Sequence, residues 1–111
     1  MITVIKSPFV QYKLTILRNK KTSNTVFRQT MNEISYLIAS DVLQYVPFKK
    51  QTIETPLKKM SGTVLGQPII LVPILRAGLG LLEGFAKFLP EAEKGHIGLY
   101  RDEQTYAPVE Y

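Results

Sequence analysis

The stretch VPILRAGLGLLEG, residues 72–84, joins two patterns of hydrophobicity around a single arginine. Residues 68–75 form a continuous apolar run rich in β-branched side chains, which is typical of a strand covered on both faces. From Leu79 onward, apolar residues recur at helical spacing until Pro90 ends the pattern. The sequence therefore predicts a strand, a turn that carries Arg76, and a helix.

A second strand is expected within KGHIGLYRDE, residues 94–103, after a short acidic linker. The order strand, helix, strand defines a βαβ unit, whose two strands run parallel and whose crossover is right-handed. We therefore predict an α/β fold, with a parallel sheet and flanking helices.

The N-terminal half carries two further predicted elements. QYKLTILR, residues 11–18, alternates polar and apolar side chains and favours a short strand. Residues 25–46 favour an amphipathic helix, capped by Ser23 or Asn24 and ended by Pro47. Its apolar stripe consists of Phe27, Met31, Ile34, Leu37, Ile38, Val42, Leu43 and Tyr45.

Two other segments are less regular. Residues 49–66 are polar and punctuated by Pro and Gly, with a brief strand expected at residues 51–54. The final stretch TYAPVEY, residues 105–111, alternates like the start of a hairpin, and we expect it to have no partner strand. On helix 25–46, Arg28 and Glu33 lie outside the apolar stripe and are assigned to solvent.

Composition limits the possible classes of protein. The chain has 111 residues, of which 45% are hydrophobic and 21% charged, as in an ordinary globular domain. It has no cysteine, which excludes disulfides, thiolate nucleophiles and cysteine metal sites. The sequence shows no signal peptide, and its longest apolar run is far shorter than the roughly 20 residues that a membrane span needs. A cytoplasmic location is therefore expected.

The formal charge of +5 is unevenly distributed. Residues 1–60 carry ten Lys and Arg against three acidic residues, whereas residues 61–111 carry four against six. A basic half can bind nucleic acid or an anionic small molecule, but solvated surface lysines are the commoner reason for such a balance. No aromatic RNA-binding motif or zinc spacing supports the nucleic-acid alternative.

Arg76 is the first candidate binding residue. In parallel α/β sheets, ligands bind at the carboxyl ends of the strands, next to the N-termini of the following helices. Gly78 and Gly80 would let the backbone approach a ligand, and free N–H groups of the helix would face an anion. The pattern favours a phosphate or pyrophosphate site, and the alternative is a tight turn whose arginine reaches water.

Two known phosphate loops match poorly. A Walker A loop needs a lysine followed by Ser or Thr after its glycines, and none follows here. Gly78, Gly80 and Gly84 form G-x-G-x-x-x-G, a loose variant of the dinucleotide fingerprint, with Asp102 at a suitable distance to hold a ribose. A dinucleotide site therefore remains a minor alternative.

YRDE, residues 100–103, ends the second predicted strand at the same edge of the sheet. Arg101 is therefore expected to converge with Arg76 on one ligand, and two guanidinium groups suit a polyphosphate. The alternative for Arg101 is a surface ion pair with Asp102 or Glu103. Asp102 and Glu103 could together form a magnesium site, and the alternative is an exposed acidic turn. The single histidine, His96, is assigned a structural or exposed position.

At this point the motifs VPILRAGLGLLEG and GLYRDEQTYAPVEY closely resemble the uracil phosphoribosyltransferases. SPFVQYKLTILRNKKTSNTVFR and IETPL resemble the same family, in the same order, so that the resemblance covers essentially the whole chain. It implies a type I phosphoribosyltransferase fold, and an enzyme that converts uracil and 5-phosphoribosyl 1-diphosphate to UMP and diphosphate.

The resemblance also implies roles for particular residues. Arg76 and Arg101 match the family's arginines that contact phosphoribosyl diphosphate, with Mg²⁺ carried on the diphosphate. It implies a homodimer, or a higher oligomer, with exchanged arms, and some relatives are activated by GTP, for which Lys21 and Arg28 are candidates. The resemblance assigns no catalytic residue and no metal ligand within the chain.

The chain departs from the family in two respects. Ser7 and Tyr12 stand where family members often have histidines. The family's loop for the 5′-phosphate and its uracil-recognising segment have no counterpart here, so residues 1–111 are expected to be the N-terminal part of one domain. Residues 1–60 would carry the first strand and helix, and residues 61–111 the βαβ unit and the start of a β-arm.

These departures predict that the 111 residues alone lack turnover. A non-catalytic association or nucleotide-responsive module is the alternative function.

Overall fold

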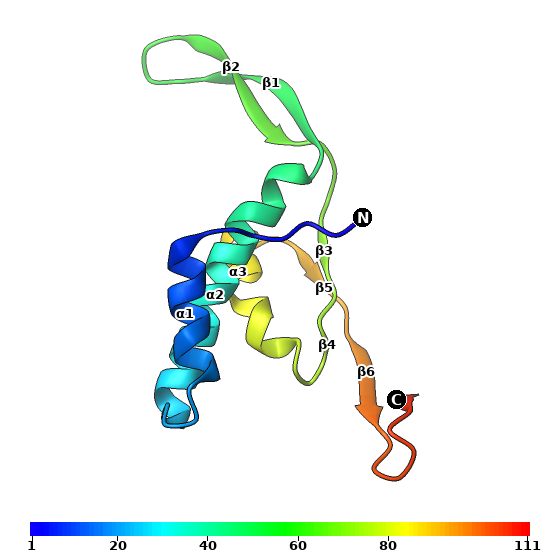
Figure 1. Cartoon of the computed structure of the whole chain (residues 1–111). Helices are drawn as coiled ribbons and strands as arrows, with labels where there is room; N and C mark the ends of the chain where they lie inside the picture. Colours follow the sequence, from blue (N-terminus) through cyan, green and yellow to red (C-terminus); the bar gives the residue numbers. More distant parts are fainter.

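The computed structural model describes residues 1–111 and shows a mixed α/β chain (Figure 1). Three helices, a 3₁₀ turn and seven short strands follow in the order α1 (Pro8–Arg18), α2 (Asn24–Val42), η1 (Leu43–Tyr45), β1 (Phe48–Glu54), β2 (Lys59–Leu65), β3 (Ile70–Leu71), β4 (Ile74–Leu75), α3 (Leu79–Phe88), β5 (Glu93–Lys94), β6 (Ile97–Arg101) and β7 (Pro108–Glu110). The helices lie on one side of strands β3 to β6 (Figure 1).

The strand predicted at residues 11–18 is wrong, because this segment lies in helix α1. Ser7 caps the helix by accepting a hydrogen bond from the Val10 backbone N–H at 3.5 Å, and Pro8 occupies the first turn. Val10 is buried, and Leu14 and Leu17 are half-buried at intervals of four and three residues. The alternation of polar and apolar residues at positions 11–18 is therefore compatible with a helix as well as with a strand, and the Ser7 cap favours the helix.

Helix α2 confirms the predicted amphipathic helix. Ser23 is the N-cap and accepts a hydrogen bond from the Val26 backbone N–H at 3.2 Å. The helix gives way to η1 before Pro47, as expected. Its buried positions are, however, only partly those of the predicted stripe: Thr30, Ile34, Ser35 and Ala39. The small residues among them allow α3 to approach closely.

The βαβ unit is confirmed. Strand β3 pairs in parallel with β5, and β4 pairs in parallel with β6, with α3 as the crossover. The predicted continuous strand at residues 68–75 is divided into β3 and β4, with Val72 and Pro73 between them. Proline has no backbone N–H to donate to a ladder, which accounts for the interruption.

The final segment has a partner, contrary to expectation. Strand β7 pairs antiparallel with β6, with Tyr100 opposite Val109. Strand β6 is thus the centre of a three-stranded sheet in the order β4, β6, β7. Strands β6 and β7 therefore form an antiparallel hairpin within the chain, with β7 at the edge of the sheet.

Residues 48–65 form an antiparallel hairpin that projects from the body of the molecule (Figure 1). The register pairs Phe48 with Leu65 and Glu54 with Lys59. Only residues 51–54 of this hairpin were predicted, because lysine and threonine conceal the strand pattern.

The core is small. Only nine residues are buried, and the radius of gyration is 18.2 Å, compared with about 13 Å for a compact domain of this length. Ile70, Ile74 and Ile97 are 61%, 51% and 45% exposed, so the predicted covering of the strands on both faces is wrong. The helices cover one face only. None of the helices is long and apolar enough to cross a membrane.

Candidate functional site

Arg76 and Arg101 lie at the carboxyl ends of neighbouring parallel strands. The β4–β6 register places Leu75 opposite Gly98, so Arg76 follows the last paired residue of β4 and Arg101 ends β6. Both side chains are exposed, and neither has an ion-pair partner. Two unpaired guanidinium groups at one edge of a sheet are suited to a ligand with several phosphate oxygens.

The loop after Arg76 is tightly folded. The peptide bond between Leu75 and Arg76 is cis. The Gly78 N–H donates to the Ile74 carbonyl at 2.7 Å, and the Leu79 N–H donates to the Arg76 carbonyl at 3.1 Å. The next N–H, of Gly80, is also used within the turn, at 3.2 Å. The expectation of free helix amides facing an anion is therefore not met for these three groups, whereas the side chains of Arg76 and Arg101 are both exposed.

The three glycines face the protein itself. A Cβ on Gly78 would lie 2.6 Å from the Ile74 backbone nitrogen, and one on Gly80 would lie 3.1 Å from Met31 Cγ. A Cβ on Gly84 would lie 2.4 Å from the Ser35 backbone carbon of α2. The prediction that Gly78 and Gly80 admit a ligand is thus replaced by a packing role. The interpretation of this loop as a dinucleotide site rested on these glycines, and it therefore loses that support.

Asp102 shapes the loop between β6 and β7. Its carboxylate accepts hydrogen bonds from the backbone N–H groups of Thr105 and Gln104, at 2.7 and 2.9 Å, and these bonds lower the pKa of Asp102. The carboxylate is therefore engaged in a turn at the end of the arm, which is the turn alternative of the sequence analysis. Nowhere in the chain do three or more His, Asp or Glu side chains gather as a metal site would need.

The remaining candidates lie apart from the arginine edge. His96 is exposed, directly before β6. Lys21 and Arg28 are exposed, in the turn before α2 and in the first half of that helix.

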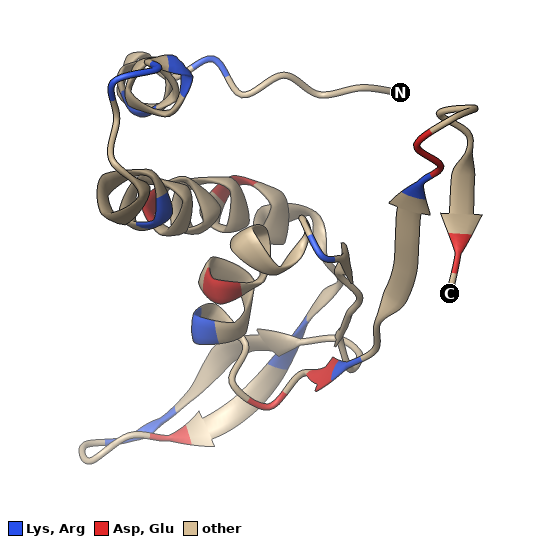
Figure 2. Ribbon diagram, turned by 90° about the horizontal axis from the view of Figure 1, so that it is seen from below, with Lys and Arg blue, Asp and Glu red and all other residues tan.

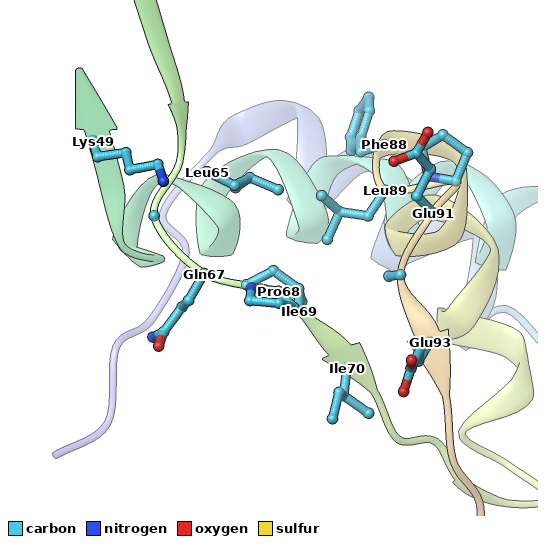
Figure 3. Close-up of a pocket in the computed structure, with 13 residues that line it drawn as sticks. Lys49, Leu65, Gln67, Pro68, Ile69, Ile70, Phe88, Leu89, Glu91 and Glu93 are labelled. Atoms are coloured by element: carbon cyan, nitrogen blue, oxygen red, sulfur yellow. The ribbon is translucent and has the colours of Figure 1, made fainter. Parts of the chain in front are cut away.

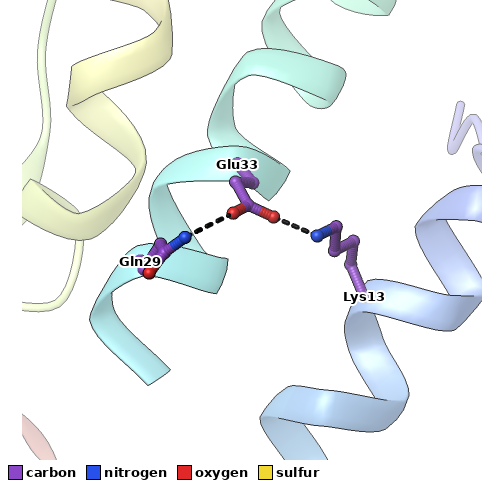
Figure 4. Close-up of polar contacts among 3 residues, drawn as sticks. All are labelled: Lys13, Gln29 and Glu33. Atoms are coloured by element: carbon purple, nitrogen blue, oxygen red, sulfur yellow. Dashed lines mark hydrogen bonds and ion pairs between the residues drawn. The ribbon is translucent and has the colours of Figure 1, made fainter. Parts of the chain in front are cut away.

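Glu33 was predicted to lie free in solvent, and this prediction is wrong. Its carboxylate forms an ion pair with Lys13 of α1 and accepts a hydrogen bond from Gln29 at 3.2 Å (Figure 4). The Lys13 hydrogen bond is the main cause of a lowered pKa at Glu33. This pair joins α1 to α2.

Two features were missed by sequence reasoning. The first is the contact of α2 with α3, where the Gly84 backbone N–H donates to Ser35 Oγ at 2.9 Å in a buried position. The i, i+4 spacing of small residues, Gly80 and Gly84, was the available signal. The second is a cavity at the amino ends of β3 and β5, opposite the arginine edge, for which the sequence held no signal (Figure 3).

Comparison with known proteins gives a consistent result. The family model described as uracil phosphoribosyltransferase matches residues 4–111. The chain belongs to the uracil phosphoribosyltransferase family. Among curated relatives with that name, it is 49% identical to the protein of Lactiplantibacillus plantarum over 97% of its length, and 45% identical to that of Clostridium novyi over 99%.

These relatives are longer. The chain covers 52% of the Lactiplantibacillus plantarum protein and 53% of the Clostridium novyi protein, so it spans about half the length of the curated relatives it matches. A solved structure, titled the structure of AQ2163 protein from Aquifex aeolicus, superposes with a TM-score of 0.90 at 29% identity, covering all of this chain and 54% of that one. The expected fold class, an incomplete α/β phosphoribosyltransferase-like fold, is thereby confirmed.

Proposed function

We propose that the chain is part of an enzyme that makes UMP and diphosphate from uracil and 5-phosphoribosyl 1-diphosphate. The observation that carries this proposal is the match of residues 4–111 to the uracil phosphoribosyltransferase family. The unpaired Arg76 and Arg101 at one edge of the sheet support it, because they suit the diphosphate of this substrate.

In the proposed reaction, N1 of uracil forms a bond to the anomeric carbon of the ribose as the bond to the diphosphate oxygen breaks. The N1 proton is lost, and positive charge develops on the ribose ring. Arg76 and Arg101 would hold the diphosphate in line and neutralise the charge that grows on its leaving oxygen. Neither arginine transfers a proton, so both are binding residues.

Magnesium enters this proposal as part of the substrate. Asp102, the acid nearest the arginine edge in sequence, already accepts two backbone hydrogen bonds. We propose that magnesium arrives on the diphosphate, and that Arg76 and Arg101 would bind phosphate oxygens of the same group.

We propose that turnover requires residues that the family supplies beyond the matched half. The 111-residue chain is then expected to form no UMP, and clear turnover by the chain alone contradicts this part of the proposal. The test is a fusion of this chain to the part of the Lactiplantibacillus plantarum relative that follows its matched half. The fusion is expected to form UMP from uracil and magnesium phosphoribosyl diphosphate.

In this fusion, Arg76→Ala and Arg101→Ala should each lower kcat/KM for phosphoribosyl diphosphate. Charge-assisted hydrogen bonds contribute about 1.5–3 kcal/mol each, which corresponds to roughly 10- to 100-fold. Arg18→Ala is the matched control, because Arg18 is an exposed arginine at the end of α1. A folded but inactive fusion, or equal activity of all three variants, contradicts the proposal.

The proposed enzyme is cytoplasmic, forms a homodimer or a higher oligomer, and responds to GTP. Lys21 and Arg28, both exposed and close in sequence, are the proposed contacts for the nucleotide phosphates. Calorimetry of the fusion with GTP tests this role. Heat of binding that is lost in Lys21→Ala and Arg28→Ala supports the role, and absence of heat and of activation ends it.

A further inference from the structure

The loop between β6 and β7 is anchored by a single carboxylate oxygen. Oδ1 of Asp102 accepts hydrogen bonds from the backbone N–H groups of Thr105, at 2.7 Å, and of Gln104, at 2.9 Å. The main chain of Asp102 is fixed as well, because its N–H donates to the Ala107 carbonyl and its carbonyl accepts from the Tyr106 N–H, each at 2.9 Å. A side chain that bonds the amides just ahead of it forms an Asx turn. Asp102 therefore holds both ends of this loop.

The loop needs such an anchor because of Tyr106. This residue has a φ of 59°, in the left-handed region that residues other than glycine seldom occupy. A conformation of this kind persists only where surrounding contacts hold it. The Tyr106 side chain is 70% exposed, so packing does not supply these contacts. The hydrogen bonds to Asp102 do, together with the bond from the Ala107 N–H to Thr105 Oγ1 at 3.3 Å.

The loop fixes the place of Arg101. Arg101 is the last residue of β6 and lies opposite Pro108, the first residue of β7, and the bond from the Asp102 N–H to the Ala107 carbonyl closes the ladder directly beyond this pair. Figure 2 shows the same order of charges, with a basic position at the tip of β6 and acidic positions at the start of the loop. Although Asp102 follows Arg101 directly, its carboxylate is bound by backbone amides and forms no ion pair with the guanidinium group.

We propose that Asp102 is a positioning residue for Arg101 in the binding of diphosphate. Its carboxylate closes the loop, so that Arg101 stays in the strand while its guanidinium group remains unpaired. Ordering a long side chain on binding costs affinity, and a strand end that is already ordered reduces this cost. Arg101 must bind the diphosphate for its position to matter, so the role of Asp102 rests on the proposed function.

Calorimetric titration of the 111-residue chain with magnesium diphosphate separates the effect of the turn from that of the charge. Asp102→Ala and Asp102→Asn both remove the negative charge, but only asparagine keeps an Oδ1 atom that can accept from the two amides. Asp102→Glu keeps the charge, and its side chain is too long for the same turn. The alanine and glutamate variants should bind roughly 3- to 10-fold more weakly, as expected for an arginine that must be ordered on binding, and the asparagine variant should bind like the unsubstituted chain.

Glu103→Ala is the matched control, because Glu103 is the adjacent acid, is exposed and has no ion pair. This variant should bind like the unsubstituted chain. The NMR signals of the Gln104 and Thr105 amides report the turn directly: they should keep their positions in the asparagine variant and move in the alanine and glutamate variants. Circular dichroism should be unchanged throughout, because the loop contributes no buried residue.

Arg101→Ala is titrated alongside to test the site itself. If this variant binds more weakly while every Asp102 variant binds normally, or if asparagine behaves like alanine, the role of Asp102 is overturned and the proposed function stands. If Glu103→Ala weakens binding as much as Asp102→Ala, the role of Asp102 is overturned as well. If the chain binds no diphosphate, or binds it independently of Arg101, the diphosphate site on which both proposals rest is overturned.

Discussion

Substitution of Gly84 by alanine is the sharpest test of how α3 is positioned behind the arginine loop. Gly84 is the one buried residue of α3, and its backbone N–H donates to Ser35 Oγ of α2 at 2.9 Å. An added Cβ would lie 2.4 Å from the Ser35 backbone carbon and 2.5 Å from the Tyr36 backbone nitrogen. Because these are backbone atoms of a helix, relief requires α3 to move away by about 1 Å to reach ordinary contact distance.

Two effects oppose each other in Gly84→Ala. Alanine is favoured over glycine in a helix by about 1 kcal/mol. Overpacking costs about 1–3 kcal/mol, and loss of the Ser35 hydrogen bond costs about 1 kcal/mol more. The net expectation is a loss of about 1–3 kcal/mol in the free energy of unfolding, so steric cost outweighs propensity.

Urea denaturation followed by circular dichroism measures this loss. Gly80→Ala is the matched control on the same helix, because its Cβ would meet Met31 Cγ at 3.1 Å, a side-chain atom that can turn aside. The control should stay within roughly 0.5 kcal/mol of the unsubstituted chain. An alanine at position 84 that leaves stability unchanged or raises it, or an equal loss in both variants, refutes the close-approach reasoning.

One further substitution and one pH titration test local features of the fold. Ser23→Ala removes the α2 N-cap and should lower the free energy of unfolding by about 1 kcal/mol. The control is Ser40→Ala, which changes an exposed serine within the same helix and should leave this free energy unchanged. Equal effects of the two substitutions in urea denaturation would disprove the capping role. The Asp102 carboxylate has a pKa below its ordinary 3.8, so the turn it holds is fully stabilised above pH 3.8 and loses this stabilisation as the pH falls through the lowered value. The backbone amide signals of Gln104 and Thr105 should titrate in NMR spectra with a midpoint below 3.8, and a midpoint at or above that value contradicts the hydrogen bonds.

The βαβ unit was predictable because its signals are local and agree with one another. The β-branched run, the glycines after Arg76 and the helical spacing up to Pro90 all favour one order of elements. The parallel pairing of β4 with β6 follows from that order, and with it the placement of Arg76 and Arg101 at one edge. The candidate site was therefore the part of the molecule most accessible to sequence reasoning.

Other features depended on contacts that no local pattern records. Residues 11–18 alternate like a strand, and only the Ser7 cap and the packing of Val10 make them a helix. The glycines of the loop suggested room for a ligand, whereas their space is filled by Ile74 and Met31. The spacing of apolar residues in the sequence shows which residues share a face of a helix or strand, but it does not show which element covers that face.

The central claim is that Arg76 and Arg101 together bind the diphosphate of phosphoribosyl diphosphate. Isothermal titration of the 111-residue chain with magnesium diphosphate tests it most directly, in comparison with Arg76→Ala, Arg101→Ala and the control Arg18→Ala. The account predicts measurable binding that each site variant weakens by roughly 10-fold or more, with Arg18→Ala unchanged. Binding that survives the loss of both site arginines, or no binding by the unsubstituted chain, would contradict the account.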